Sequence, residues 1–285
     1  MSVKISNLIR DIYSRITTAA PVLSQNVEAF GQNLAQIMSD RLNETSGQNY
    51  LRPSNLSQPC ERKLWYTINS PDDAEPLGPK AKLKFLYGDI IEALILFLSA
   101  EAGHEVEGCQ DQVEISGVKG RRDAIIDGHL VDVKSANSRS FRKFSDGLTD
   151  DTDGFGYRGQ LRFYLKASEN DPKVRVKDKA AFLAVDKELG GLALDWHDQD
   201  DTDWEALIAS KRAMLDASSP PDRAFEDVPE GKSGNMKLPF QCAYCPFKKK
   251  CWPDLRTFLY ARGPVYLTTV VTEPKVAEIT DGTAV

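Results

Sequence analysis

The sequence predicts an α/β fold in which a central mixed sheet is flanked by helices. A long helix is predicted at residues 82–102, because its middle third is apolar nearly all round. A tight hairpin is predicted at residues 122–134, where Asp127-Gly128 separates two apolar-rich runs and suits a type I′ turn. Residues 180–186 are almost wholly apolar, which is typical of a central strand.

The same patterns predict the remaining elements and the division of the chain. Strands are predicted at 112–116, 191–196 and 265–271, and helices at 155–168 and 202–216. Apolar residues at helical spacing before residue 51 predict a helical appendage at residues 1–50. We expect one main domain at residues 51–262 and a C-terminal tail at residues 263–285.

Composition limits the classes of function. The chain of 285 residues is 41% hydrophobic and 27% charged, as in soluble globular proteins. It shows neither an apolar run of the ~20 residues that span a membrane nor the layout of a secretory signal, so we expect a cytoplasmic protein without a membrane partner. The net charge of −6 argues against a protein that coats nucleic acid indiscriminately, so any DNA contact must come from local basic patches.

The predicted hairpin places two carboxylates opposite each other. A two-residue turn fixes the register, so Asp123 faces Asp132 on one side of the sheet, where like charges repel. Strand alternation puts Lys134 on the same side. Mg²⁺ and Mn²⁺ prefer carboxylate oxygens, so a metal between Asp123 and Asp132 with Lys134 beside it is one interpretation. An ordinary surface hairpin is the other.

Two helical positions add candidates. Glu92 lies in the apolar part of the long predicted helix, where an unpaired carboxylate is costly, so it must be protonated, paired with a cation or bound to metal. The opposed aspartates favour metal. Gln160 and Tyr164 share one helical face and could hydrogen-bond a phosphate or orient an active-site lysine. On this evidence alone, the polar outer face of an amphipathic helix is the more common explanation.

An odd number of cysteines fits metal ligation better than a disulfide framework. They are Cys60, Cys109, Cys242, Cys245 and Cys251. Cys242-x₂-Cys245-x₅-Cys251 is a metal-ligand spacing, and an all-sulfur site needs Cys60 or Cys109 as its fourth ligand. Cys60 follows Ser54, a predicted N-cap, and alone would be a small buried hydrophobic residue. The spacing does not separate zinc from an iron–sulfur cluster.

Taken in order, these motifs resemble the RecB-like branch of the PD-(D/E)XK nucleases. The resemblance is to CRISPR-associated and phage-type exonucleases that carry a four-cysteine iron–sulfur cluster. It spans roughly residues 50–255 and rests on Ser54-x-Leu56 with Cys60 and Tyr66, Gly88-x₃-Glu92, Gly120-x₂-Asp123, Asp132-Val133-Lys134, Gln160-x₃-Tyr164 and the cysteine motif.

The resemblance implies a PD-(D/E)XK core, restriction-endonuclease-like, with an iron–sulfur-stapled subregion. The implied metal ligands are Glu92, Asp123, Asp132 and the carbonyl of Val133. Lys134 would act in catalysis, supported by Gln160 and Tyr164. Cys60 would join Cys242, Cys245 and Cys251 around a [4Fe–4S] cluster, with Zn²⁺ as the alternative. Relatives often have histidine at the position of Glu92, so the choice between Mg²⁺ and Mn²⁺ stays open.

The implied activity is metal-dependent exonucleolytic hydrolysis of single-stranded or end-containing DNA. It would serve recombination, repair or phage DNA metabolism in a bacterial or phage-infected cell. Basic side chains expected to contact the DNA backbone are Arg62, Lys63, Arg139, Arg142, Arg158, Arg162 and Lys248, with its neighbours Lys249 and Lys250. Trp65, Tyr66 or Phe155 would stack on bases. A zinc-containing, non-catalytic nucleic-acid-binding protein and an endonuclease on the same fold are the alternatives.

Overall fold

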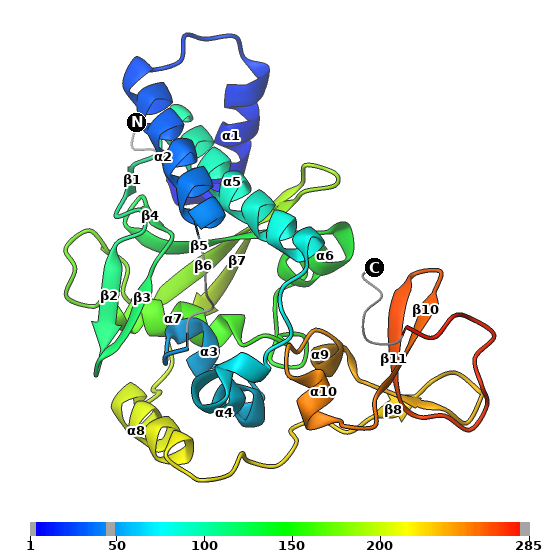
Figure 1. Cartoon of the computed structure of the whole chain (residues 1–285). Helices are drawn as coiled ribbons and strands as arrows, with labels where there is room; N and C mark the ends of the chain where they lie inside the picture. The colour runs from blue at the N-terminus through cyan, green and yellow to red at the C-terminus, as the bar shows by residue number, and fades with distance from the viewer. Residues whose placement is uncertain (1–3, 44–48, 280–285) are drawn as a thin grey trace. The chain divides into compact units, whose positions relative to one another are not determined.

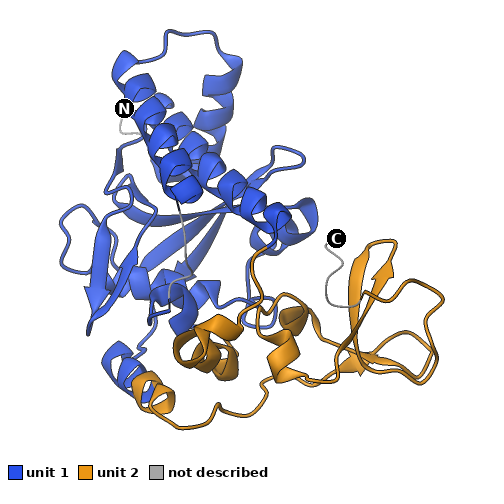
Figure 2. Cartoon of the chain, viewed as in Figure 1, with its two compact units in different colours: residues 1–57, 78–210 blue, residues 58–77, 211–285 orange. Residues whose placement is uncertain are grey.

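The computed structural model describes residues 4–43 and 49–279 and divides the chain into two units (Figures 1 and 2). The first unit comprises residues 1–57 and 78–210. The second comprises residues 58–77 and 211–285. The predicted main domain, residues 51–262, therefore contributes to both units.

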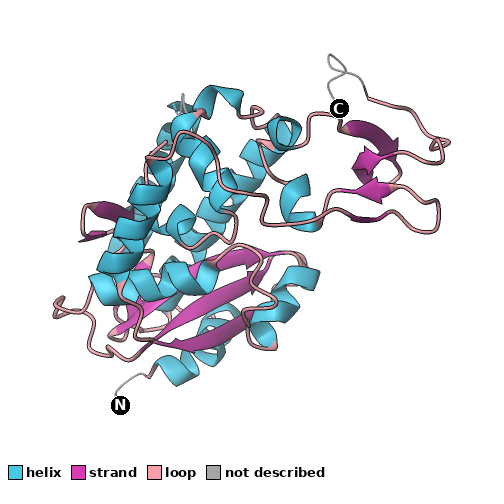
Figure 3. Cartoon of the chain, turned by 90° about the horizontal axis from the view of Figure 1, so that it is seen from below, coloured by secondary structure: helices cyan, strands magenta, loops and turns pink. Residues whose placement is uncertain are grey.

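A five-stranded sheet forms the centre of the first unit (Figure 3). Its strand order is β1 (Val106–Glu107), β4 (Ala124–Ile126), β5 (His129–Ala136), β6 (Lys179–Asp186) and β7 (Leu192–Asp198). Strands β5 and β6 are parallel, and the other neighbours are antiparallel. The connection between the parallel strands contains α6 (Ser138–Ser145) and α7 (Tyr157–Ala167), as a parallel pair requires. The predicted mixed α/β sheet is confirmed.

The β4–β5 hairpin has the predicted register. The pairs are Ala124 with Val131, Ile125 with Leu130 and Ile126 with His129. Asp127 and Gly128 both have positive φ, at 50° and 79°, as a type I′ turn requires. Extended by one step beyond the pair of Ala124 and Val131, this register sets Asp123 opposite Asp132.

The sheet is covered on both faces, so its central strand is apolar on both. Leu183 and Val185 of β6 belong to a core shared with α5 (Pro79–Glu101), whereas Phe182 and Ala184 belong to a core shared with α7. Figure 1 shows α1, α2 and α5 on one side of this sheet and α7 on the other. Burial on both faces explains the uninterrupted apolar run that predicted the strand.

The helices expected before residue 51 are present. They are α1 (Leu8–Thr17), preceded by a 3₁₀ turn at Ile5–Asn7, and α2 (Ser24–Asn43). Ile5, Leu8 and Ile12 are buried in the core on the α5 side of the sheet. This part of the chain therefore packs into the first unit and contributes to its core.

Two local predictions need correction. Ser54 is not an N-cap: helix α3 (Pro53–Leu56) begins one residue earlier, and Arg52 is its N-cap, because proline suits the first helical position. The predicted strand at 112–116 is β2 (Gln112–Ile115), but it pairs with the unpredicted β3 (Val118–Arg121) in a separate two-stranded sheet. Strand β3 contains Gly120 and the charged residues Lys119 and Arg121 among its four residues, which hid its strand character.

The second unit contains short elements. Its helical segments are α4 (Glu61–Asn69), a 3₁₀ turn at Pro71–Asp73, α9 (Phe240–Ala243) and α10 (Lys248–Cys251). Its sheet has the order β10 (Arg256–Tyr260), β11 (Gly263–Thr269), β9 (Met236–Lys237) and β8 (Val228–Pro229). Helix α8 (Trp204–Leu215) begins in the first unit and ends in the second. Among the described helices, none combines the length and apolarity needed to span a membrane.

Candidate functional site

Four of the predicted site residues come together in the first unit. Glu92 is carried by α5, which packs against β5. Asp123 directly precedes β4, while Asp132 and Lys134 lie two residues apart in β5. The helix and the hairpin therefore bring three carboxylates and one ammonium to the same place.

Each of the three carboxylates has a partner within the protein. The carboxylate of Asp123 accepts a hydrogen bond from the backbone N–H of Val133 at 2.8 Å. Asp132 forms an ion pair with the ammonium of Lys134. Glu92 accepts a hydrogen bond from the side-chain amide of Gln110 at 2.6 Å.

The carboxylates also perturb one another. Burial raises the pKa of Glu92 from 4.5 to about 7, and the negative charges of Asp132 and Asp89 act in the same direction. Burial, then Asp132 and Glu92, raise the pKa of Asp123 well above its ordinary value. When all three carboxylates are ionised, the single positive charge of Lys134 does not balance their negative charge.

Lys134 is a cation held between acids and aromatic rings. Burial opposes its charge, but Asp132 and Asp123 overcome this effect and raise its pKa above the ordinary value. Its ammonium lies 4.9 Å from the ring centroid of Tyr157 and 5.7 Å from that of Phe182. Phe182 pairs with Asp132 across β5 and β6, so the sheet register places its ring beside the lysine.

The described part of the chain, residues 4–43 and 49–279, contains no group of three or more His, Cys, Asp and Glu side chains arranged to hold a metal ion. The internal partners of Glu92, Asp123 and Asp132 explain this arrangement in the first unit, because each carboxylate is turned to a protein donor. The donors nevertheless fit a hard divalent cation in kind, since all three side chains offer carboxylate oxygens.

Gln160 and Tyr164 lie beside these carboxylates on α7. The amide of Gln160 donates to the hydroxyl of Tyr164 at 3.3 Å. Burial raises the pKa of Tyr164 to about 12, and the charges of Asp132 and Asp123 contribute. A β-carbon at Gly120 would lie 2.8 Å from the Tyr164 ring and 2.6 Å from Pro53, so this glycine lets the tyrosine pack closely.

The four cysteines that the resemblance groups together all belong to the second unit. The pKa of Cys242 is raised to about 12, chiefly by burial and then by Cys245, Cys60 and Cys251. Cys60 is the N-cap of α4, and its sulfur accepts the backbone N–H of Lys63 at 3.4 Å. All of these cysteines are free. These mutual effects show that the four thiols lie near one another.

Cys109 belongs to the other unit. Desolvation raises the pKa of its thiol, and the charges of Glu92 and Asp111 raise it further. Of the two candidates for a fourth sulfur ligand, Cys60 lies with the cysteine motif and Cys109 lies near the carboxylates of the first unit.

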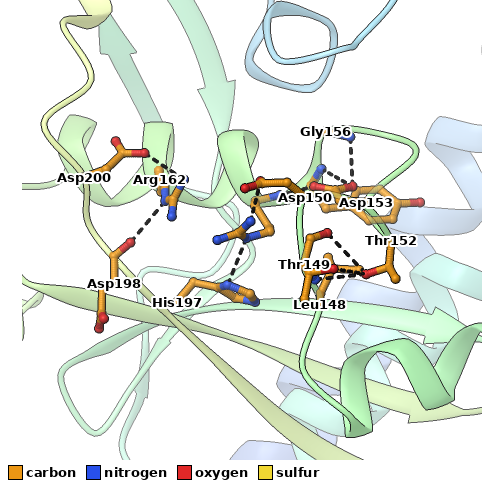
Figure 4. Close-up of polar contacts among 12 residues, drawn as sticks. Leu148, Thr149, Asp150, Thr152, Asp153, Gly156, Arg162, His197, Asp198 and Asp200 are labelled. Carbon is orange, nitrogen blue, oxygen red and sulfur yellow. Dashed lines mark hydrogen bonds and ion pairs between the residues drawn. The ribbon is translucent and has the colours of Figure 1, made fainter.

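Several basic residues predicted to contact DNA have partners inside their own unit. Arg162 forms an ion pair with Asp200 at 2.7 Å and donates to the carbonyl of Asp198 (Figure 4). Arg158 forms an ion pair with Asp150 and contacts His197. In the second unit, Lys248 is buried and pairs with Glu75, Lys250 pairs with Asp73, and Arg62 donates to the carbonyl of Pro221. Each of these basic side chains therefore has a partner within the protein that explains its position without DNA.

Other candidates for nucleic-acid contact differ in exposure. Arg139 and Arg142 are exposed on α6, and Lys63 is half-buried near Cys245. Phe155 is 41% exposed. Tyr66, by contrast, is buried against Phe247, and Trp65 donates its indole N–H to the carbonyl of Ala217. Phe155 is thus better placed for stacking than Tyr66.

The acidic loop before α7 is held by hydrogen bonds (Figure 4). The carboxylate of Asp153 accepts the backbone N–H groups of Gly156, Tyr157 and Arg158, at 2.9, 3.0 and 2.8 Å. The backbone N–H of Leu148 donates to Asp195 at 3.0 Å. These bonds fix the first turn of α7 and hence Tyr157. Sequence reasoning missed both Tyr157 and Gln110, since neither belongs to a motif that marks such a site.

Comparison with known proteins adds little to this geometry. No protein-family model and no curated protein matches the chain. A solved structure titled "Crystal structure of SSO0001" is similar at a TM-score of 0.42 and 17% sequence identity, over 78% of this chain and 96% of that chain. The class defined by the structure is a mixed α/β protein with an acidic, lysine-containing site.

Proposed function

We propose that the protein is a Mg²⁺- or Mn²⁺-dependent DNA exonuclease with a PD-(D/E)XK core. The observation that supports this most is the convergence of Glu92, Asp123 and Asp132 with Lys134 from one helix and one hairpin. A cluster of carboxylates can bind a catalytic divalent cation, and a protonated amine beside it can stabilise negative charge. Both suit the hydrolysis of a phosphodiester bond, because this reaction develops negative charge on the phosphoryl oxygens. DNA as the substrate, and cleavage from free ends, are proposed from the motif resemblance.

The proposed metal ligands are Glu92, Asp123, Asp132 and the backbone carbonyl of Val133. When bound, the divalent ion supplies Lewis-acid polarisation of the phosphate and a bound water of lowered pKa. The negative charge of the three carboxylates would attract the ion. Helix α5 and the β4–β5 hairpin set the spacing of the ligands.

Lys134 serves this reaction as a charge stabiliser. Its pKa is raised by Asp132 and Asp123, so it keeps its proton at neutral pH. A fixed ammonium stabilises the negative charge that develops on the phosphoryl oxygens. Tyr157 and Phe182 restrict where that ammonium can lie. Gln160 and Tyr164, close to Asp132 and Asp123, are proposed to support the lysine or the DNA strand.

In the second unit we propose that Cys60, Cys242, Cys245 and Cys251 hold a [4Fe–4S] cluster. The cluster would tie the start of α4 to the segment 242–251, which is distant in sequence. The role we propose for it is structural, because it would join two segments of the chain. Zn²⁺ is the alternative occupant of the same four sulfurs.

A nuclease assay tests the proposed activity. End-labelled linear and closed circular single-stranded DNA are incubated with Mg²⁺, Mn²⁺ or EDTA. We expect degradation of linear DNA that requires the metal and is lost in Asp132→Ala and Lys134→Ala. Glu114→Gln and Lys119→Ala are matched controls, because this exposed pair lies on the separate β2–β3 hairpin.

The substrates separate the alternatives. Cleavage of circular DNA would replace the exonuclease with an endonuclease on the same fold. Retained DNA binding without metal-dependent cleavage would favour a non-catalytic nucleic-acid-binding protein. Undiminished cleavage by Asp132→Ala would end the proposed catalytic role of this site.

A further inference from the structure

Gln110 has a backbone conformation that its residue type rarely adopts. Its φ is 57°, in the left-handed region that favours glycine and, among other residues, asparagine and aspartate. For an L-residue this region is unfavourable, because the β-carbon crowds the following carbonyl oxygen. Glycine would adopt this φ without a steric penalty. The presence of glutamine here therefore needs an explanation in terms of its side chain.

Gln110 joins two of the proposed metal ligands. Its side-chain amide donates to Glu92 on α5 at 2.6 Å, and its backbone N–H donates to the carbonyl of Asp123 at 3.1 Å. A single residue of the β1–β2 loop therefore contacts both the helix and the hairpin that carry the site.

The loop around Gln110 is itself fixed. Asp111 accepts the backbone N–H of Arg122 at 3.2 Å through its carbonyl, and its carboxylate pairs with the guanidinium of Arg122 at 2.9 Å. Arg122 is buried, with 1% of its surface exposed. The left-handed backbone at Gln110 is thus anchored on both sides, and the amide is aimed at Glu92.

We infer that Gln110 is a positioning residue of the metal site proposed above. By holding one oxygen of the Glu92 carboxylate, it would orient the other oxygen toward a divalent cation. Partners of metal-ligating groups commonly contribute 10–100-fold to metal affinity, although they never touch the ion. This inference rests on the proposed function, because it assumes that Glu92 is a ligand.

Gln110→Gly separates a role in the fold from a role at the site. Glycine relieves the positive φ, so the thermal midpoint of the metal-free protein is expected to stay equal or rise. Without the amide, Mn²⁺ affinity is expected to fall by roughly 10-fold or more. Stability and affinity would then move in opposite directions, which loss of structure cannot produce.

Ser116→Gly is the matched control, and Gln110→Asn is a second variant. Ser116 also has a positive φ, 47°, but lies in the turn between β2 and β3. Its replacement makes the same backbone change and is expected to leave Mn²⁺ affinity unaltered. Asparagine tolerates the left-handed region but shortens the amide by one methylene, so its Mn²⁺ affinity is expected to fall while the fold is retained.

Isothermal titration of each metal-free full-length protein with Mn²⁺ gives the affinities, and calorimetric melting gives the midpoints. Wild-type affinity in Gln110→Gly and Gln110→Asn would overturn this inference and leave the proposed metal site intact. An equal loss in Ser116→Gly would also overturn it. A wild-type protein that binds no Mn²⁺ would instead overturn the proposed function, and this inference with it.

Discussion

The ammonium of Lys134, on strand β5, lies 4.9 Å from the centre of the ring of Tyr157, the first residue of helix α7. Asp153 fixes that ring by accepting the backbone N–H of Tyr157. A cation over an aromatic face is worth about 0.5–2 kcal/mol. The position of the proposed charge stabiliser thus depends on the capped first turn of α7.

Replacement of Tyr157 tests this contact. Tyr157→Phe keeps the ring and is expected to keep kcat within about threefold, whereas Tyr157→Leu removes it and is expected to lower kcat by about tenfold. Steady-state cleavage of linear single-stranded DNA measures both. Tyr13→Leu is the control, since Tyr13 is an exposed tyrosine of α1 outside the site, and it is expected to leave kcat unchanged. Equal kcat values for the leucine and phenylalanine variants at position 157 would refute the positioning role.

The raised pKa of Glu92 predicts how stability depends on pH. The unfolded chain ionises this carboxyl near 4.5 and the folded, metal-free protein near 7. The folded state therefore binds the proton more tightly, and this contribution to stability is complete below pH 4.5 and is lost as pH rises through 7. Glu92→Gln, which cannot ionise, is expected to melt higher than the wild type at pH 8 and to differ much less at pH 4.5.

Thermal melts in EDTA at pH 4.5, 6.5 and 8 check this expectation. Glu114→Gln removes an exposed carboxylate from the β2–β3 hairpin and is expected to show no such trend. A difference between Glu92→Gln and wild type that stays constant across the three pH values would contradict the assigned pKa.

Metal binding is expected to compete with the same proton. A cation needs the ionised carboxylate, so Mn²⁺ affinity should rise between pH 6 and pH 8 and binding should release protons. Titration calorimetry in two buffers of different ionisation enthalpy measures the protons released. The release is expected to shrink in Glu92→Gln. Affinity independent of pH, with no proton release, would show that the ion binds elsewhere.

The cysteine cluster predicts a spectroscopic signature. Anaerobically purified protein is expected to absorb at about 400 nm if the four sulfurs hold an iron–sulfur cluster. Cys60→Ser and Cys242→Ser are expected to lose this band and to melt lower, whereas Cys109→Ser keeps it, because Cys109 lies in the other unit. Zinc without the band would assign the site to Zn²⁺, and a band that persists in Cys60→Ser would remove Cys60 from the ligand set.

The hairpin shows why part of the site could be predicted from sequence. A two-residue Asp-Gly turn leaves no freedom of register, so the opposition of Asp123 and Asp132 followed from counting residues. Glu92 stood out because a carboxylate in an apolar helix needs a partner. Both signals are local in sequence, and the structure places these three residues together.

The remaining features depend on tertiary contacts. Arg158 and Arg162 looked like a basic face of α7, but Asp150, from the loop before this helix, and Asp200, from the loop after β7, pair with them. Gln110 could not be predicted from sequence, because its conformation goes with tertiary hydrogen bonds, from its own N–H to Asp123 and from Arg122 to the carbonyl of Asp111. The division into two units was equally hidden, because the second unit is assembled from residues 58–77 and 211–285.

The measurement that tests the account most directly is anomalous diffraction from crystals grown with Mn²⁺. The account predicts an anomalous peak within bonding distance of carboxylate oxygens of Glu92, Asp123 and Asp132, and its loss in crystals of Asp132→Asn. A fully occupied Mn²⁺ elsewhere in the molecule, with these three carboxylates still turned to Gln110, Val133 and Lys134, would contradict it.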